Sequence, residues 1–137
     1  MTIRDAIGWI GLGHHPRDTA LATVDAFNRR DWKRLNELLD EEFYYLDGEA
    51  NRIDTSGRFM TTLRGLLDDA PDLKVDLDTL EDAGQMVYMR GHTTSSDFRF
   101  RTHSMWRAKV SGGRMVSLEN FQVVNSIHLA KYAAQLA

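Results

Sequence analysis

The stretch "FYYLDG" spaces three side chains, Phe43, Tyr45 and Asp47, two residues apart. Side chains of a β-strand alternate between two faces, so these three share one face. A carboxylate that loses solvation among aromatic rings is a candidate general base or acid near neutral pH. The alternative is a solvated aspartate that opens a turn before Gly48, since Asp-Gly is ordinary turn chemistry.

The other residue types exclude several kinds of chemistry. The chain has no cysteine, which rules out disulfides, thiol nucleophiles and cysteine-ligated metals. Its five histidines form no helical i, i+4 pair with a carboxylate. No G-x-S-x-G or phosphate loop occurs, and the glycines of "GWIGLG" do not match a dinucleotide fingerprint. We therefore expect no metal and no cofactor.

Size and charge suggest one domain and a small partner. The 137 residues, 42% of them hydrophobic, suit a single compact core. A net charge of −3 gives no basic excess for nucleic acid. The apolar runs fall far short of the roughly 20 residues that span a bilayer, and the N-terminus lacks the apolar core of a signal peptide. We expect a cytoplasmic protein that binds a small hydrophobic ligand, not nucleic acid or membrane.

Hydrophobic periodicity predicts three helices, followed by a meander of strands. The first helix starts near Pro16, the second follows the corner at 28–31, and the third is capped by Thr55 or Ser56 and ends before Pro71. The period then changes to two, with strands at 73–79, 86–94, 98–110 and 114–124. Helices followed by antiparallel hairpins indicate an α+β fold. We expect an N-terminal arm over 1–15, a domain over 16–125 and a C-terminal helix over 126–137.

A two-residue turn at 96–97 would pair Arg90 with His103 and His92 with Arg101. One face of this hairpin is then apolar and should meet the helices, whereas the other is basic and is solvated or covered at an interface. A slip of one residue would instead turn the arginines into the cavity. The apolar face carries Val87, Met89, Gly91, Thr93, Phe98, Phe100, Thr102, Ser104 and Trp106.

The outer side of the predicted sheet also carries apolar residues. Tyr88, Met105, Phe121 and Val123 fall there by the same alternation. Such a mixed face suggests cover by a second subunit. We therefore expect a homodimer that forms through the outer sheet face.

The order of elements and three segments resemble a known group of proteins. The segments are "AFNRRDWKRLNELLDEEFYYLDG", "SGRFMTTL" and "THSMWRAKVSGGRMVSLENF". They are similar to the SnoaL-like, ketosteroid-isomerase-like branch of the nuclear transport factor 2 superfamily. The resemblance covers about residues 16–125. It implies a curved antiparallel sheet wrapped by three helices into a cone, a mostly apolar pocket and frequent homodimers.

The resemblance also implies roles for individual residues. Asp47 falls where ketosteroid isomerases place their proton-shuttling aspartate, whereas Thr23 and Ser104 fall where those enzymes place a tyrosine and a second acid. Tyr45 and Asn120 are the substitute hydrogen-bond donors. The wall of the pocket is expected to include Phe43, Phe59, Met89, Phe100, Trp106 and Leu118.

Three functions remain open at this point. The first is a cofactor-independent cyclase, isomerase or dehydratase that acts on a small cyclic carbonyl or hydroxyl compound. Asp47 would take the proton, while Tyr45 with Asn120 or Ser104 would hydrogen-bond the developing oxyanion. The second is a noncatalytic ligand-binding or dimerisation domain of the same fold. The third is epoxide hydrolysis, because Tyr45-Leu46-Asp47 resembles the first catalytic pair of limonene epoxide hydrolase.

Overall fold

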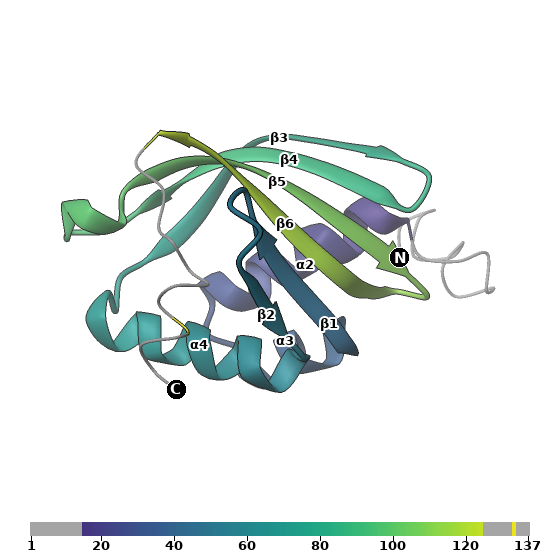
Figure 1. The fold of residues 1–137 in the computed structure, drawn as a ribbon, viewed down its shortest axis with the longest axis horizontal. Helices are drawn as coiled ribbons and strands as arrows, with labels where there is room; N and C mark the ends of the chain where they lie inside the picture. Colours follow the sequence, from purple (N-terminus) through teal and green to yellow (C-terminus); the bar gives the residue numbers. More distant parts are fainter. Residues whose placement is uncertain (1–14, 125–132, 134–137) are drawn as a thin grey trace, which may run out of the picture.

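A computed structural model of the chain describes residues 15–124 and 133. Within these residues, three helices lie on one side of a curved six-stranded sheet (Figure 1). The predicted α+β fold is confirmed. The predicted N-terminal arm and C-terminal helix lie outside the described residues, apart from His15 and Ala133. The elements are α2 (Pro16–Asn28), α3 (Trp32–Leu38), β1 (Leu39–Asp47), β2 (Arg52–Asp54), α4 (Ser56–Asp69), β3 (Lys74–Ala83), β4 (Met86–Thr94), the 3₁₀ helix η1 (Phe98–Phe100), β5 (Thr102–Ser111) and β6 (Arg114–Val124).

The helices begin where their capping residues predict. Pro16 occupies the first turn of α2. The side chain of Asp31 accepts a hydrogen bond from Arg34 N at 3.1 Å and so caps α3. Thr55 caps α4 in the same way, through a bond of 3.2 Å from Arg58 N. Each helix then buries its apolar side against the sheet.

Two polar side chains at the corner after α2 fasten the helices to the sheet. The amide of Asn28 donates to Val75 O and accepts from Val75 N, both at 2.9 Å. The guanidinium of Arg30 donates to the carbonyl oxygens of Pro71 and Leu73. The "AFNRRDW" segment therefore holds α2 against the start of β3, which is a structural role.

The sheet order is β2-β1-β6-β5-β4-β3. All neighbouring strands are antiparallel except β1 and β6, which run parallel and pair Tyr45 with Leu118 and Asp47 with Asn120. Sequence alternation predicted neither this parallel contact nor the three-residue β2. The contact matters because it brings the end of the first strand beside the last strand.

The register between β4 and β5 differs from the prediction by two residues. Arg90 lies opposite Met105, and His92 lies opposite His103. The segment 98–100 forms η1 instead of strand, and this moves the start of β5 to Thr102. Phe98, predicted on the apolar face, is 77% exposed. A shift of two preserves side-chain alternation, so the other face assignments of this hairpin still hold.

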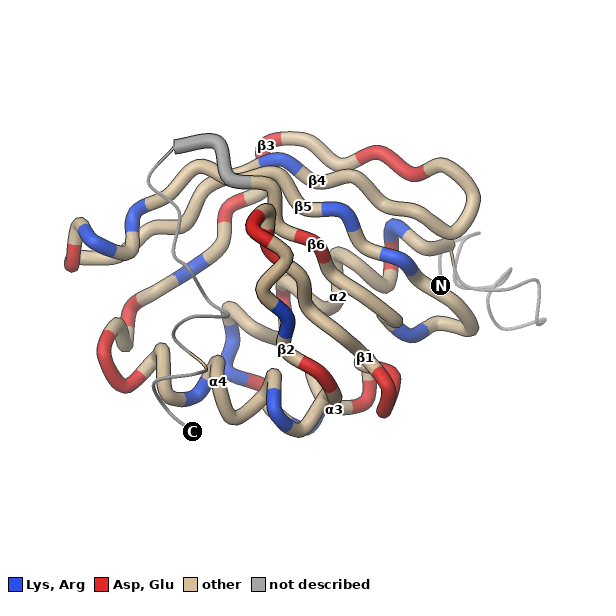
Figure 2. The backbone as a smooth tube through the Cα atoms, in the orientation of Figure 1, with Lys and Arg blue, Asp and Glu red and all other residues tan. Residues whose placement is uncertain are grey.

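Charged residues of both signs are spread over the helices and strands without a stripe of one sign (Figure 2). Within the part of the chain that the structure describes, no helix is long and apolar enough to cross a membrane.

Candidate functional site

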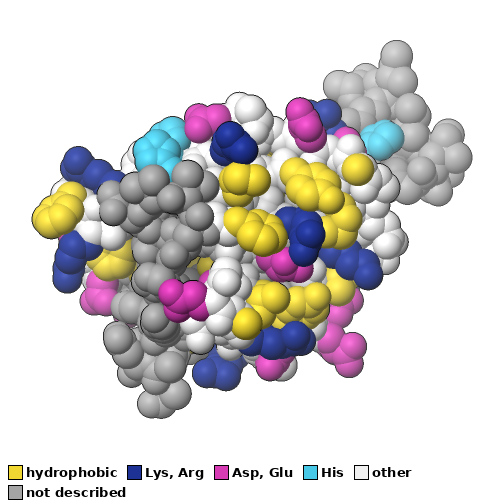
Figure 3. All heavy atoms as spheres, turned by 45° about the horizontal axis from the view of Figure 1, so that its top comes forward, with side chains coloured by type: hydrophobic (Ala, Val, Ile, Leu, Met, Phe, Trp, Pro, Cys, Tyr) yellow, Lys and Arg dark blue, Asp and Glu magenta, His cyan; other side chains and the backbone are white. Residues whose placement is uncertain are grey.

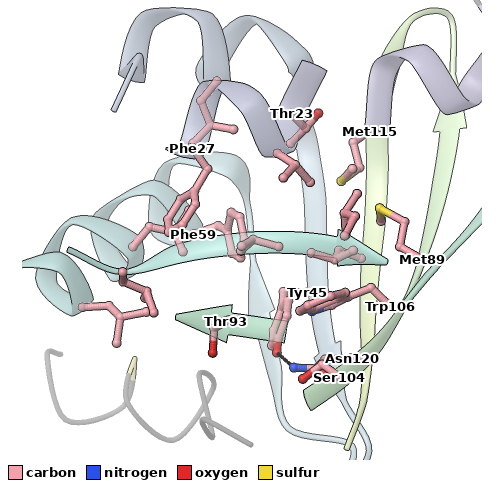
Figure 4. Close-up of a pocket in the computed structure, with 18 of the residues that line it drawn as sticks. Thr23, Phe27, Tyr45, Phe59, Met89, Thr93, Ser104, Trp106, Met115 and Asn120 are labelled. Atoms are coloured by element: carbon pink, nitrogen blue, oxygen red, sulfur yellow. Dashed lines mark hydrogen bonds between the residues drawn. The ribbon is translucent and has the colours of Figure 1, made fainter. Parts of the chain in front are cut away.

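A cavity of about 140 Å³ lies between the concave face of the sheet and the helices (Figure 4). Its walls are mostly apolar, and α2, α3, α4 and every long strand contribute to them. An apolar protein cavity of about 150 Å³ is large enough to bind benzene. The lining residues are Thr23, Val24, Phe27, Leu35, Tyr45, Phe59, Leu63, Leu66, Leu73, Val75, Leu77, Met89, Thr93, Thr102, Ser104, Trp106, Met115, Leu118 and Asn120.

One part of the wall is polar, and it is built from β1, β5 and β6. Asn120 Nδ2 donates a hydrogen bond of 3.1 Å to the hydroxyl of Tyr45, and Ser104 lies beside this pair (Figure 4). The parallel pairing of β1 with β6 sets Tyr45 opposite Leu118 and Asp47 opposite Asn120. Tyr45 and Asn120 are therefore diagonal neighbours on adjacent strands, close enough for their side chains to meet. Phe59 of α4 stacks on the ring of Tyr45, with centroids 5.7 Å apart. The phenol is therefore held between a helix and two strands.

Tyr45 is 2% exposed, and burial raises its pKa well above the ordinary value. The hydrogen bond from Asn120 acts in the opposite direction, and the nearby charge of Asp47 adds a smaller upward contribution to the pKa. Tyr45 is thus a neutral phenol at physiological pH. Because Asn120 donates to its oxygen, the phenolic hydrogen can be directed at another acceptor.

Asn120 leaves one strong acceptor without a partner. Its Oδ1 is buried and receives no hydrogen bond from any described residue. A buried polar atom left unpaired costs roughly 1–3 kcal/mol. The hydroxyl groups of Thr23, Thr93 and Thr102 at the wall are bonded within the protein. The polar end of the cavity therefore combines the hydroxyl groups of Tyr45 and Ser104 with the amide of Asn120, whose Oδ1 has no partner among the described residues.

Asp47 does not line the cavity. It lies at the end of β1, where Oδ1 accepts hydrogen bonds of 2.9 Å from the backbone N–H groups of Glu49 and Asn51. Its Oδ2 accepts a bond of 3.1 Å from Asn51 Nδ2. The carboxylate thus organises the turn between β1 and β2. Its position next to Asn120 in the sheet keeps its charge close to Tyr45.

The structure brings together most of the predicted pocket residues. Tyr45, Ser104 and Asn120 form the polar end, and four of the six expected wall residues line the cavity, namely Phe59, Met89, Trp106 and Leu118. Phe43 is buried but packs behind Phe59, with ring centroids 4.7 Å apart. Phe100 is buried in η1 and does not line the cavity.

Met115 is a wall residue that strand alternation missed. It has the opposite parity to Leu118 and Asn120, which also line the cavity. The pairing of β5 with β6 shifts between Lys109 and Val110, so Val110 lies opposite Met115 while Lys109 lies opposite Ser117. This irregularity turns Met115 inward. No local sequence signal marks it.

The basic hairpin residues lie on the other face of the sheet. Arg90, Arg101 and His103 are exposed, and none of them lines the cavity, which excludes the register slipped by one residue. His92 lies 3.6 Å from carboxylate oxygens of both Asp76 and Asp78 on that face. Across residues 15–124, no group of three or more His, Asp or Glu side chains is placed to hold a metal ion.

The fold has counterparts in solved structures. A candidate ketosteroid isomerase from Kribbella flavida is 20% identical over 79% of this chain and 77% of its own, with a TM-score of 0.69. IdmH, a candidate polyketide cyclase from Streptomyces antibioticus, is 20% identical over 78% of this chain and 91% of its own, with a TM-score of 0.68. An LEH-like epoxide hydrolase from M. tuberculosis is 16% identical over 88% and 90%, with a TM-score of 0.68. At these identities, the likeness concerns the fold.

The search of curated proteins found no significant match. The SnoaL-like domain family, in contrast, matches residues 20–118, which include most of α2, all of α3 and α4, most of the sheet and the wall of the cavity up to Leu118. This match extends over more than half of the chain. The chain belongs to the SnoaL-like domain family.

Proposed function

We propose that the cavity binds a small, largely apolar molecule of about one ring whose oxygen group lies against Tyr45 and Asn120. The observation that carries this proposal is the buried Tyr45–Asn120 pair, which offers a donor and an unpaired acceptor to an otherwise apolar space. Ligand sites commonly combine apolar walls with a few polar groups that fix orientation.

The experiment is a binding titration followed by tryptophan fluorescence, since Trp106 lines the cavity. Six-membered ring compounds with and without an oxygen group are compared on the wild-type chain. We expect saturable binding, and we expect Tyr45→Phe to weaken the oxygenated ligands while leaving benzene unchanged. Tyr44→Phe is the matched control, because it removes the neighbouring hydroxyl from the opposite side of β1. The proposal fails if no ring compound binds.

Acid–base catalysis is a second candidate, which rests on the proximity of Asp47 to Tyr45, although Asp47 does not line the cavity. Its carboxylate belongs to the residue that pairs with Asn120 in the sheet, and its charge acts on the phenol of Tyr45. In this proposal, Asp47 takes a proton next to a carbonyl group while Tyr45 donates to the carbonyl oxygen. The reaction would be of the isomerase, cyclase or dehydratase kind and would need no cofactor. An epoxide-opening reaction would also depend on Asp47 to activate water.

Catalysis, unlike binding, requires the carboxylate of Asp47 to reach the substrate. Its two oxygens now accept three hydrogen bonds within the turn, so proton abstraction requires the turn to open or the substrate to reach over it. Once a converted compound is found, Asp47→Asn should abolish turnover and leave ligand affinity within about twofold. Turnover that survives Asp47→Asn rules out this candidate and leaves the binding proposal intact.

A further inference from the structure

The unpaired Oδ1 of Asn120 distinguishes between two kinds of oxygen that a ligand could present. A ketone or an ether oxygen only accepts hydrogen bonds, so it pairs with Tyr45 and leaves Oδ1 buried without a donor. A hydroxyl group accepts from Tyr45 and donates to Oδ1 through the same oxygen. The two protein groups are adjacent, since they are already joined by a hydrogen bond of 3.1 Å.

The charges around the cavity also favour a neutral hydroxyl group as the ligand's oxygen group. No Lys, Arg or His appears among the described residues that line the cavity. An anion placed there would lose its hydration, would meet the unpaired Oδ1, and would lie near the negative charge of Asp47. A phenolate or carboxylate is therefore disfavoured, whereas a neutral hydroxyl group meets both of its partners.

We infer that the natural ligand is a neutral hydroxyl compound of about one ring, a phenol, cyclic enol or cyclic alcohol, which donates its proton to Asn120 Oδ1. The inference rests on the proposed binding function and narrows it to one ligand class. The cavity volume sets the size, because about 140 Å³ holds one six-membered ring. Asn120 thus accepts a hydrogen bond from the ligand's hydroxyl group, while Tyr45 donates a hydrogen bond to the same oxygen.

The test uses matched ligands on the unmodified chain. Cyclohexanol is compared with cyclohexanone, and phenol with anisole, with benzene as the ligand that lacks oxygen. We expect each hydroxyl compound to bind at least about tenfold more tightly than its partner, since an acceptor-only ligand leaves Oδ1 unpaired. In Asn120→Leu this ratio should fall close to one. Asn36→Leu, a change at an exposed position of α3, should keep the ratio.

A second arm tests the charge of the bound form. A nitrophenol is titrated at pH values on both sides of its own pKa. We expect its affinity to fall as the solution pH rises past that pKa, because only the neutral form binds. Tighter binding of the phenolate would overturn the inference and would support oxyanion stabilisation by Tyr45.

The outcomes separate this inference from the function on which it rests. Binding of benzene with equal affinity for cyclohexanol and cyclohexanone leaves the binding function standing and overturns the selection of hydroxyl compounds. A preference for ketones overturns it too, and shows that Asn120 presents its amide N–H groups to the ligand and its oxygen to Tyr45. If no ring compound binds, both proposals fail. The comparison of ligands requires no variant, so a failure of Asn120→Leu to fold does not affect it.

Discussion

Asn120 Nδ2 lies 3.1 Å from the hydroxyl of Tyr45, although the two residues are 75 positions apart in the chain. The parallel contact of β1 with β6 creates this proximity, since it places the C-terminal part of β1 beside the C-terminal part of β6. The bond lies at the wall of an apolar cavity and is buried on both sides. The hydrogen bond between Asn120 and Tyr45 therefore depends on the order and direction of the strands in the sheet.

Tyr45 should resist ionisation. Its pKa lies above the ordinary 10.0 because burial disfavours the phenolate. In an alkaline titration followed by tyrosinate absorbance, Tyr45→Phe should therefore reproduce the wild-type amplitude near pH 10. A loss of amplitude near pH 10 in Tyr45→Phe would show that Tyr45 ionises normally.

The raised pKa of Tyr45 also makes the free energy of unfolding depend on pH. Above pH 10.0 the unfolded chain releases the Tyr45 proton before the folded chain does, so the folded state binds more protons and the free energy of unfolding falls as the pH rises. Below that pH the contribution is fully present. Urea unfolding at pH 9 and pH 11 should reveal a smaller decrease for Tyr45→Phe than for wild type. An identical decrease in both proteins would contradict the assignment to Tyr45.

Asp47 is expected to matter for the turn between β1 and β2 whether or not it is catalytic. Asp47→Ala removes the acceptor of two backbone N–H groups and should lower the free energy of unfolding by about 1–3 kcal/mol. Asp47→Asn keeps an acceptor at Oδ1 and should cost less. Urea unfolding of the two variants checks the order. An Asp47→Ala variant as stable as wild type would show that the turn does not depend on this carboxylate.

The parts of the fold that could be predicted are those governed by local rules. Caps and the 3.6-residue period locate α2, α3 and α4, and alternation locates β4 and β6 to the residue. Alternation also separates cavity residues such as Met89 and Trp106 from the exposed Arg90. These residues lie in regular elements, where a side chain's direction follows from its position in the chain.

The parts that could not be predicted depend on contacts distant in sequence or on irregular backbone. The 3₁₀ helix η1 interrupts a run of strand-like residues and leaves Phe98 exposed. Met115 faces the cavity because of a local irregularity in pairing. A turn at Asp47 was one of the two alternatives from the sequence, but the side-chain bond from Asn51 was not predicted, because that amide approaches Asp47 only after the chain has reversed. Local patterns carry no information on such partners.

Gly91 should tolerate no larger side chain. A Cβ atom there would clash with the backbone oxygen of Asp76 and lie 3.0 Å from the Cα of Leu77, where the pairing of β3 with β4 is irregular. Neither neighbour is a flexible side-chain end, so Gly91→Ala should destabilise the protein by about 1–3 kcal/mol or more. Gly57→Ala in α4 is the matched control, since a Cβ there meets nothing within 4 Å. Thermal unfolding should separate the two variants, and equal midpoints would contradict the close approach.

The outer sheet face carries the surface on which we expect two copies to associate. Tyr88 and Phe121 are 45% and 40% exposed, and Met105 lies opposite Phe121 in the register. Hydrophobic side chains gather near basic ones on the face turned forward in Figure 3. The side chain of Val123, also expected there, lies outside the described residues.

The charges at this surface allow it to pair with itself. Arg107 lies over the ring of Phe121 and forms an ion pair of 2.6 Å with Glu119, so both signs of charge lie beside the apolar residues. Under two-fold symmetry, each copy then offers a cation and an anion to the other. Burial of the exposed rings would supply the driving force.

Sedimentation velocity should therefore detect a dimer of the wild-type chain at micromolar concentration. Phe121→Glu should shift it to monomer, because each copy would lose an exposed ring and would bury two carboxylates, at positions 119 and 121, against the single guanidinium of Arg107. Phe98→Glu is the matched control, since Phe98 is more exposed but lies in η1, away from the outer face. A monomeric wild-type chain, or a dimer that both variants leave intact, would rule out this interface. Dissociation by Phe98→Glu alone would instead place the contact at η1.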